Sequence, residues 1–181
     1  LYFNKTGSNT VAIGDSALMN NNNTYNNVGV GSKALFKNTT GYYNVAIGYQ
    51  SLYSNTTSGY NTAVGYQALY ANTGTAYDNT AVGFQSLYRN TTGNLNTSVG
   101  VWALLNNTTG SNNVANGVYA LQQNTTGSNN VASGFYAAFY NNGNSNVAIG
   151  THSLFNATTT RNTVAIGDSS LLSNTVSYSY N

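Results

Sequence analysis

Residues 61–69 read Asn-Thr-Ala-Val-Gly-Tyr-Gln-Ala-Leu, and variants of this stretch return along almost the whole 181-residue chain. When the copies are aligned on the glycine that ends each Val-Ala-Ile-Gly or Thr-Ala-Val-Gly motif, the successive spacings are 17, 17, 17, 18, 17, 17, 17, 16 and 17. The aligned glycines are Gly14, Gly31, Gly48, Gly65, Gly83, Gly100, Gly117, Gly134, Gly150 and Gly167. So regular a period is typical of stacked repeats, in which one unit cannot bury its apolar face alone.

The length and composition of the repeat indicate its secondary structure. Helical repeats need about 33 residues or more and strong helix formers, whereas this unit is half as long and rich in Gly, Asn and β-branched residues. Calcium-binding nonapeptide rolls need a recurrent aspartate, and the chain has only Asp15, Asp78 and Asp168. We therefore predict an all-β fold, a parallel β-solenoid or β-roll of ten coils of about 17 residues. The coils occupy residues 1–174, and residues 175–181 form a C-terminal cap or donated strand.

Each coil has the same predicted parts. The three residues before the glycine are Val or Thr, a small residue, and usually Val or Ile, which predicts a short strand. The glycine is the structural corner, and a second short strand follows it. That strand carries a leucine four positions after the glycine in nine of ten coils, and we expect these leucines to form a core ladder: Leu18, Leu35, Leu52, Leu69, Leu87, Leu104, Leu121, Leu154 and Leu171. A return turn, often Asn-Thr-Thr-Gly as at residues 38–41, closes the coil.

The middle residue of the first strand is small in every coil. It is Ala12, Gly29, Ala46, Ala63, Ala81, Ser98, Ala115, Ala132, Ala148 or Ala165. Close packing against this column is expected, and because a thin coil has only one inside, we assign the column to contact with another copy of the chain around a cyclic axis.

Asparagine recurs four positions before the glycine. In a stack these side chains lie above one another as an Asn ladder that hydrogen-bonds along the axis: Asn27, Asn44, Asn61, Asn79, Asn96, Asn113, Asn130 and Asn146.

Composition excludes several classes of function. Charged residues make up 4% of the chain, against about 25% in typical soluble domains, and no basic patch suited to nucleic acid is present. The absence of cysteine excludes disulfides and thiolate metal sites, and no apolar run is long enough for membrane insertion in this segment. No nucleophile, base and orienting group can be assembled from these residues. We expect no enzyme activity, no cofactor and no metal.

The motif Asn-(Val/Thr)-Ala-(Ile/Val)-Gly-x-x-(Ala/Ser), seen at residues 44–51, 61–68 and 146–153, resembles the head repeats of trimeric autotransporter adhesins. Residues 61–69 are equally similar to the Asn-Thr-Ala-Val-Gly-Tyr-Gln-Ala-Leu arrays of phage tail-fibre-like and bacterial surface proteins. The resemblance covers residues 1 to about 174. It implies a left-handed roll, a homo-oligomer with a trimer favoured, and an extracellular location at a cell or virion surface. Adhesin head coils are typically shorter than the repeat of this chain.

Several other residues are candidate sites. His152 stands where other coils have glutamine, and Asp15 and Asp168 follow motif glycines at opposite ends of the stack, so we expect surface or end-cap roles. Aromatic residues recur directly after the glycine and after the leucine, where they either pack between coils or chains or bind glycans. Sequons occur at Asn4, Asn22, Asn38, Asn55, Asn90, Asn107, Asn124 and Asn156, in a chain whose composition also produces them by chance.

The final residues leave the repeat and alternate apolar with polar, so Val176, Tyr178 and Tyr180 form an expected assembly strand. Taken together, the sequence predicts a structural or adhesive extracellular fibre or filament segment whose main partner is itself. The alternative is a glycan-binding module that uses Tyr and Asn ladders to bind surface glycans.

Overall fold

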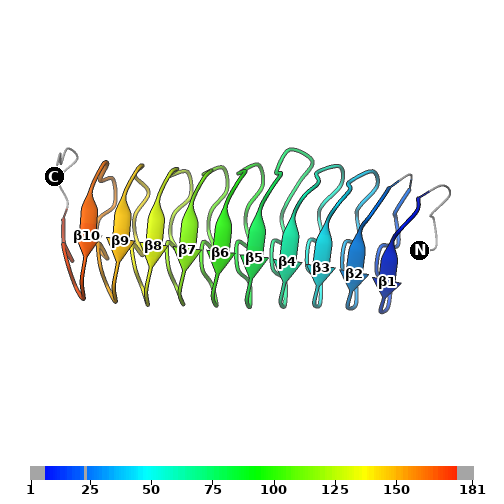
Figure 1. Ribbon diagram of the computed structural model, residues 1–181, viewed down its shortest axis with the longest axis horizontal. Coiled ribbons are helices and arrows are strands. Elements are labelled where there is room, and N and C mark those ends of the chain that lie inside the picture. The colour runs from blue at the N-terminus through cyan, green and yellow to red at the C-terminus, as the bar shows by residue number, and fades with distance from the viewer. Residues whose placement is uncertain (1–6, 23, 175–181) are drawn as a thin grey trace.

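The computed structural model describes residues 7–22 and 24–174, which form one continuous stack of coils (Figure 1). Each coil contributes one three-residue strand to a single parallel sheet whose spatial order is the chain order, with β1 and β10 at its two edges. The strands are β1 (Val11–Ile13), β2 (Val28–Val30), β3 (Val45–Ile47), β4 (Thr62–Val64), β5 (Thr80–Val82), β6 (Thr97–Val99), β7 (Val114–Asn116), β8 (Val131–Ser133), β9 (Val147–Ile149) and β10 (Val164–Ile166). This confirms the predicted all-β solenoid.

The register of the sheet follows the repeat. Between β3 and β4, Ala46 pairs with Ala63 and Ile47 with Val64, so each residue meets its counterpart in the next coil. The same pairing holds from β4 to β5, although the coil that joins them is longer than its neighbours by one residue. Its extra residue is accommodated in the loop after β4, which protrudes beyond its neighbours (Figure 1). Insertions are thus absorbed outside the sheet.

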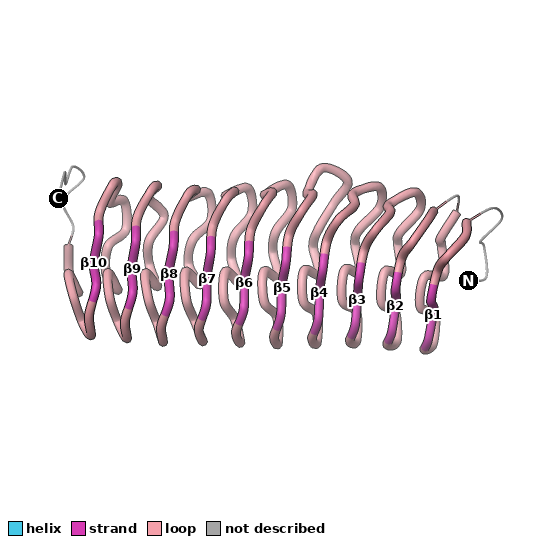
Figure 2. The backbone as a smooth tube through the Cα atoms, in the orientation of Figure 1, coloured by secondary structure: helices cyan, strands magenta, loops and turns pink. Residues whose placement is uncertain are grey.

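The predicted second strand is wrong. The residues after each glycine form turns, and the strands are short segments of otherwise looped coils (Figure 2). The residues two and four positions after the glycine have left-handed backbone, as in Gln50 (φ 53°) and Leu52 (φ 49°). Consequently Gln50 N–H donates to the preceding coil at Ser32 O (3.0 Å), while Leu52 N–H donates to the following coil at Ala68 O (3.0 Å). Hydrogen bonding in both directions offsets the cost of a conformation that L-residues rarely adopt.

The interior of the stack is narrow, and in most coils a single leucine fills it. Eight predicted core leucines, from Leu18 to Leu154, have no solvent-exposed surface, whereas Leu171 in the last coil is 40% exposed. Where Ala138 replaces leucine, the adjacent Phe139 is buried to 9% exposure. Packing of like side chains along the axis therefore makes a single apolar column.

The small residues of the strands also face this interior. Ala46, Ala63 and most of their counterparts have zero exposure, and a Cβ placed on Gly29 would lie 3.0 Å from Leu18 Cδ1. The assignment of this column to contact between copies is therefore wrong, because leucines of the same chain cover it. The Val and Ile residues on either side point outward instead.

The motif glycines have φ between 119° and 140°, a backbone geometry strained for any residue with a Cβ. A Cβ on Gly65 would also lie 2.7 Å from the carbonyl carbon of Gly83, whereas one on Gly167 meets nothing within 4 Å. We expect Gly167→Ala to cost about 1–3 kcal/mol from backbone strain. Gly65→Ala should lose about 1–3 kcal/mol more through overpacking. Urea unfolding followed by circular dichroism measures both, and equal losses would contradict the steric explanation.

Candidate functional site: ladders and the outward sheet face

The predicted Asn ladder lies inside the coils at the corner before each strand. Each Oδ1 accepts the backbone N–H of the corresponding residue in the next coil, at 2.9–3.1 Å. Each Nδ2 donates to a carbonyl in the return turn 13–15 residues further along the chain, at 2.8–3.0 Å. Some amides also bond to each other, as Asn61 Nδ2 does to Asn44 Oδ1 (3.3 Å). These side chains act mainly as connectors between backbones of successive coils.

A second asparagine ladder, which sequence reasoning missed, begins the return turns. Its members lie seven positions after the glycine and are fully buried: Asn21, Asn38, Asn55, Asn72, Asn90, Asn107, Asn124 and Asn141. From Asn38 to Asn124, each Nδ2 donates to Oδ1 of the preceding coil's asparagine at 2.9–3.2 Å. Each also donates to a carbonyl of its own turn at 2.9–3.1 Å. The regular spacing of the repeat contained the signal for this ladder too.

This second ladder changes the interpretation of the sequons. The sequon asparagines Asn38, Asn55, Asn90, Asn107 and Asn124 belong to it, so their amides are buried and already hydrogen-bonded. A glycan on such an amide nitrogen would have to displace the neighbouring coils. Asn156 is exposed and Asn22 is half-buried, whereas Asn4 lies outside the described residues.

Asn107→Ala tests the second ladder. It removes a donor to Asn90 Oδ1 and Gly110 O (both 2.9 Å) and an acceptor for Asn124 Nδ2 (2.9 Å). We expect a loss of about 1–3 kcal/mol for each buried group left unpaired. The matched control is Asn156→Ala, an exposed sequon asparagine, which should stay within about 0.5 kcal/mol of the parent. Similar unfolding midpoints for the two variants would show that the ladder adds little stability.

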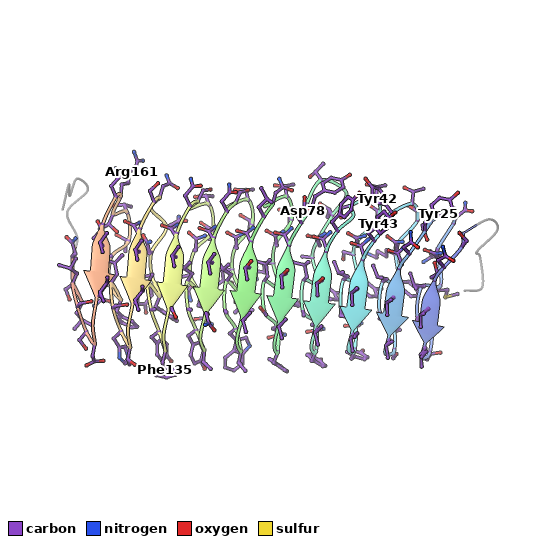
Figure 3. The ribbon with its side chains drawn as sticks, in the orientation of Figure 1. Tyr25, Tyr42, Tyr43, Asp78, Phe135 and Arg161 are labelled. Carbon is purple, nitrogen blue, oxygen red and sulfur yellow. The ribbon has the colours of Figure 1, made fainter. Side chains whose placement is uncertain are left out.

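Three columns of aromatic or amide side chains follow the outside of the stack. The first, after the leucine, stacks Phe36, Tyr53, Tyr70 and Tyr88 with ring centroids 5.1–5.3 Å apart and interplanar angles of 2–16°. The second, directly after the glycine, stacks Tyr49, Tyr66 and Phe84 at 5.0–5.3 Å. The rings of this second column are 41% to 44% exposed, and Phe135, which also directly follows a motif glycine and is labelled in Figure 3, is 45% exposed.

The third column lies two positions after the glycine and changes chemistry along its length. Gln67 Nε2 donates to Gln50 Oε1 (2.8 Å), and Gln85 Nε2 donates to Gln67 Oε1 (2.9 Å). Trp102 Nε1 in turn donates to Gln85 Oε1 (2.9 Å). From there the column is aromatic, through Tyr119 and Tyr136. His152 stacks on Tyr136 at 5.4 Å and 8°. His152 therefore occupies the predicted glutamine position as a member of a packed column.

The orientation of the rings distinguishes between the two roles expected for the aromatic columns, packing between coils and glycan binding. Sugars stack on an open aromatic face, but the near-parallel rings of the first two columns turn their faces toward the rings of neighbouring coils. Solvent meets mainly ring edges. This geometry favours packing between coils as the role of these two columns.

Tyr70 illustrates the electrostatics of the first column. Burial raises the pKa of Tyr70 above its ordinary value of 10.0, and the neighbouring phenols of Tyr88, Tyr53 and Tyr49 raise it further. Because the folded state holds this proton more tightly than the unfolded state, its contribution is complete below about pH 10 and is lost as pH rises through the raised pKa. We expect the stability of Tyr70→Phe to fall less steeply in this alkaline range than that of the parent or of Tyr25→Phe, an exposed tyrosine outside the column. Identical pH profiles from urea titrations would contradict this.

The sheet presents its Val and Ile side chains outward in two columns. One column contains Val11, Val28, Val45, Thr62, Thr80, Thr97, Val114, Val131, Val147 and Val164. The other contains Ile13, Val30, Ile47, Val64, Val82, Val99, Asn116, Ser133, Ile149 and Ile166. Nine of the Val and Ile side chains are 36% to 66% exposed. We call the two columns together the outward face.

The remaining predicted sites do not converge. Asp15 lies in the first coil and Asp168 in the last, and no three His, Cys, Asp or Glu side chains of the described residues lie close enough to hold a metal ion. The predicted assembly strand, Val176, Tyr178 and Tyr180, lies outside the described residues. No helix with the length and apolarity needed to cross a bilayer occurs within residues 7–22 and 24–174.

Comparisons with protein-family models, with curated proteins and with solved structures found no match to this chain.

Proposed function

We propose that the chain is a rod-shaped segment of an extracellular structural or adhesive fibre, and that several copies associate side by side through the outward face. The observation that carries the proposal is the full or partial exposure of two largely β-branched columns along the sheet. Contiguous apolar surfaces of this kind commonly mark interaction sites. The resemblance to adhesin heads and fibre repeats supports the extracellular assignment.

The partner that fits this face best is another copy of the chain. The face repeats with the strand spacing of about 4.7 Å over ten coils, and a second copy has the same period and length. Its footprint is roughly 470 Å², from a length of about 47 Å and a strand width of about 10 Å. A standard interface buries about 800 Å² per partner, so a flat two-copy contact is small. A cyclic assembly also covers the edges of the face, which favours three or more copies.

A fibre role suits the chemistry of the rest of the chain. Stacked coils place identical groups one strand spacing apart, which permits amide, hydroxyl and aromatic ladders but makes repeated charge repel itself. The chain carries 4% charged residues, consistent with this requirement. A rod with equivalent coils can display the same weak contact many times, so adhesion would arise from multivalency.

Val82→Lys tests the association. Val82 lies on the outward face in the middle of the sheet, so one lysine per copy would bring like charges together on a surface that must lose its water. We expect the variant to become monomeric while its circular dichroism is unchanged. Analytical ultracentrifugation of the parent and variant measures this, and electron microscopy would show thinner rods.

The matched control is Thr92→Lys, which adds the same charge to an exposed turn of the same repeat. This variant should sediment like the parent. A parent that is already monomeric at micromolar concentration, or a Val82→Lys variant that still assembles, would contradict the proposed interface.

A further inference from the structure

The outward face is apolar except at five positions. Thr62, Thr80 and Thr97 interrupt one column in β4, β5 and β6, and Asn116 and Ser133 interrupt the other in β7 and β8. In the described part of the chain, the side chains of Asn116 and Ser133 form no hydrogen bond. Asn116 is exposed, in a column otherwise composed of Val, Ile and Ser133.

We propose that Asn116 and Ser133 determine the register and direction in which copies associate. This inference rests on the self-association proposed above. An amide buried in an interface needs a partner, and an unpaired one costs far more than an unpaired methyl group. A single buried asparagine sets register and oligomeric state in coiled coils by the same principle.

Three arrangements of the copies can be compared. In a parallel, in-register assembly about an axis that runs along the rod beside the column of Ile13 and Ile166, Asn116 meets Asn116 of each neighbour and Ser133 meets Ser133. A slip of one coil places Asn116 opposite a position held by Val99 or Ser133. In a centred antiparallel pair, β7 faces β4 and β8 faces β3, so Asn116 faces Thr62 and Val64 while Ser133 faces Val45 and Ile47.

The in-register arrangement is the one that pairs like polar groups at both positions. The three threonines belong to the other column, which lies away from this axis, so they do not meet their own counterparts there. Thr80 lies in β5 and would face Thr97 of β6 in the antiparallel pair, so the threonines alone discriminate weakly. The amide at Asn116 and the hydroxyl at Ser133 provide most of the selectivity.

The experiment uses the absence of cysteine from the chain. Ser32→Cys and Thr151→Cys each introduce one thiol, in the second and ninth coils, directly after the motif glycine and beside the outward face. Seven coils separate these positions, or about 33 Å, which a short bifunctional thiol cross-linker cannot span. The two variants are cross-linked separately and as a co-assembled mixture, then separated by mass.

In-register assembly predicts links that join two thiols at position 32 or two thiols at position 151, and no product that joins the two positions. An antiparallel assembly gives the mixed product alone and would overturn the proposal. Adding Asn116→Val and Ser133→Val to both cysteine variants should preserve association but produce mixed and like products in comparable yield. Adding Thr109→Val, an isosteric change in an exposed turn, should preserve the parent pattern.

Retention of only like products in the Asn116→Val, Ser133→Val background would show that these residues do not set direction, although the copies associate. A parent that sediments as a monomer and forms no links would instead overturn the association itself. Circular dichroism of each variant checks that the coils remain folded. The two failures are therefore distinguishable.

Discussion

The interior of this solenoid is only one leucine wide, and the rest of the structure depends on that constraint. A single coil cannot enclose its own polar backbone around so small a core, so its N–H and C=O groups must be satisfied by the coils before and after it. Left-handed residues achieve this after the glycine corner, where the amides two and four positions after the glycine donate in opposite directions along the axis. The two buried Asn ladders do the same at the other corners. Stability is therefore a property of the stack and not of any one coil.

The irregular coils show how strictly hydrogen bonding is maintained. In a regular turn, one backbone carbonyl, Thr56 O, accepts three successive amides, Thr39, Thr40 and Gly41, at 2.9–3.2 Å. In the shortest coil, the side-chain oxygen of Asn142 takes that place and accepts the amides of residues 125, 126 and 127 at 2.9–3.2 Å. One pairing is lost there, because Asn141 does not reach Asn124, whose Oδ1 is left without a partner among the described residues. The shortened coil thus preserves the turn at the expense of one ladder contact.

Period and side-chain size predicted much of this fold. Regular spacing predicted the stack, and recurrent leucines coincide with the interior, because both follow from like residues lying above one another. Backbone conformation was less visible in the sequence, since Leu52 and Gln50 adopt left-handed φ where their residue types suggest a strand. The prediction that the small residues of the strands face another copy was wrong, because small residues fit equally well beside a second chain or beside Leu18 of the same chain. The second Asn ladder was missed because Asn-Thr-Thr-Gly is also typical of a solvated turn. Only the structure of the closed coil shows that the asparagine of this turn points inward.

Function in a repetitive rod must arise either from what every coil shares or from the few coils that differ. The shared features are the buried ladders, which join each coil to the next, and the outward face, which repeats a β-branched pair in most coils. Translational repetition separates unique residues along the axis, as it does Asp15 in the first coil and Asp168 in the last. Residues that depart from the repeat on a shared face can instead specify how rods align. A polar side chain in one surface is satisfied only where the facing surface also carries a polar side chain. Asn116 and Ser133 are such departures on the outward face, and the proposed register of assembly depends on them.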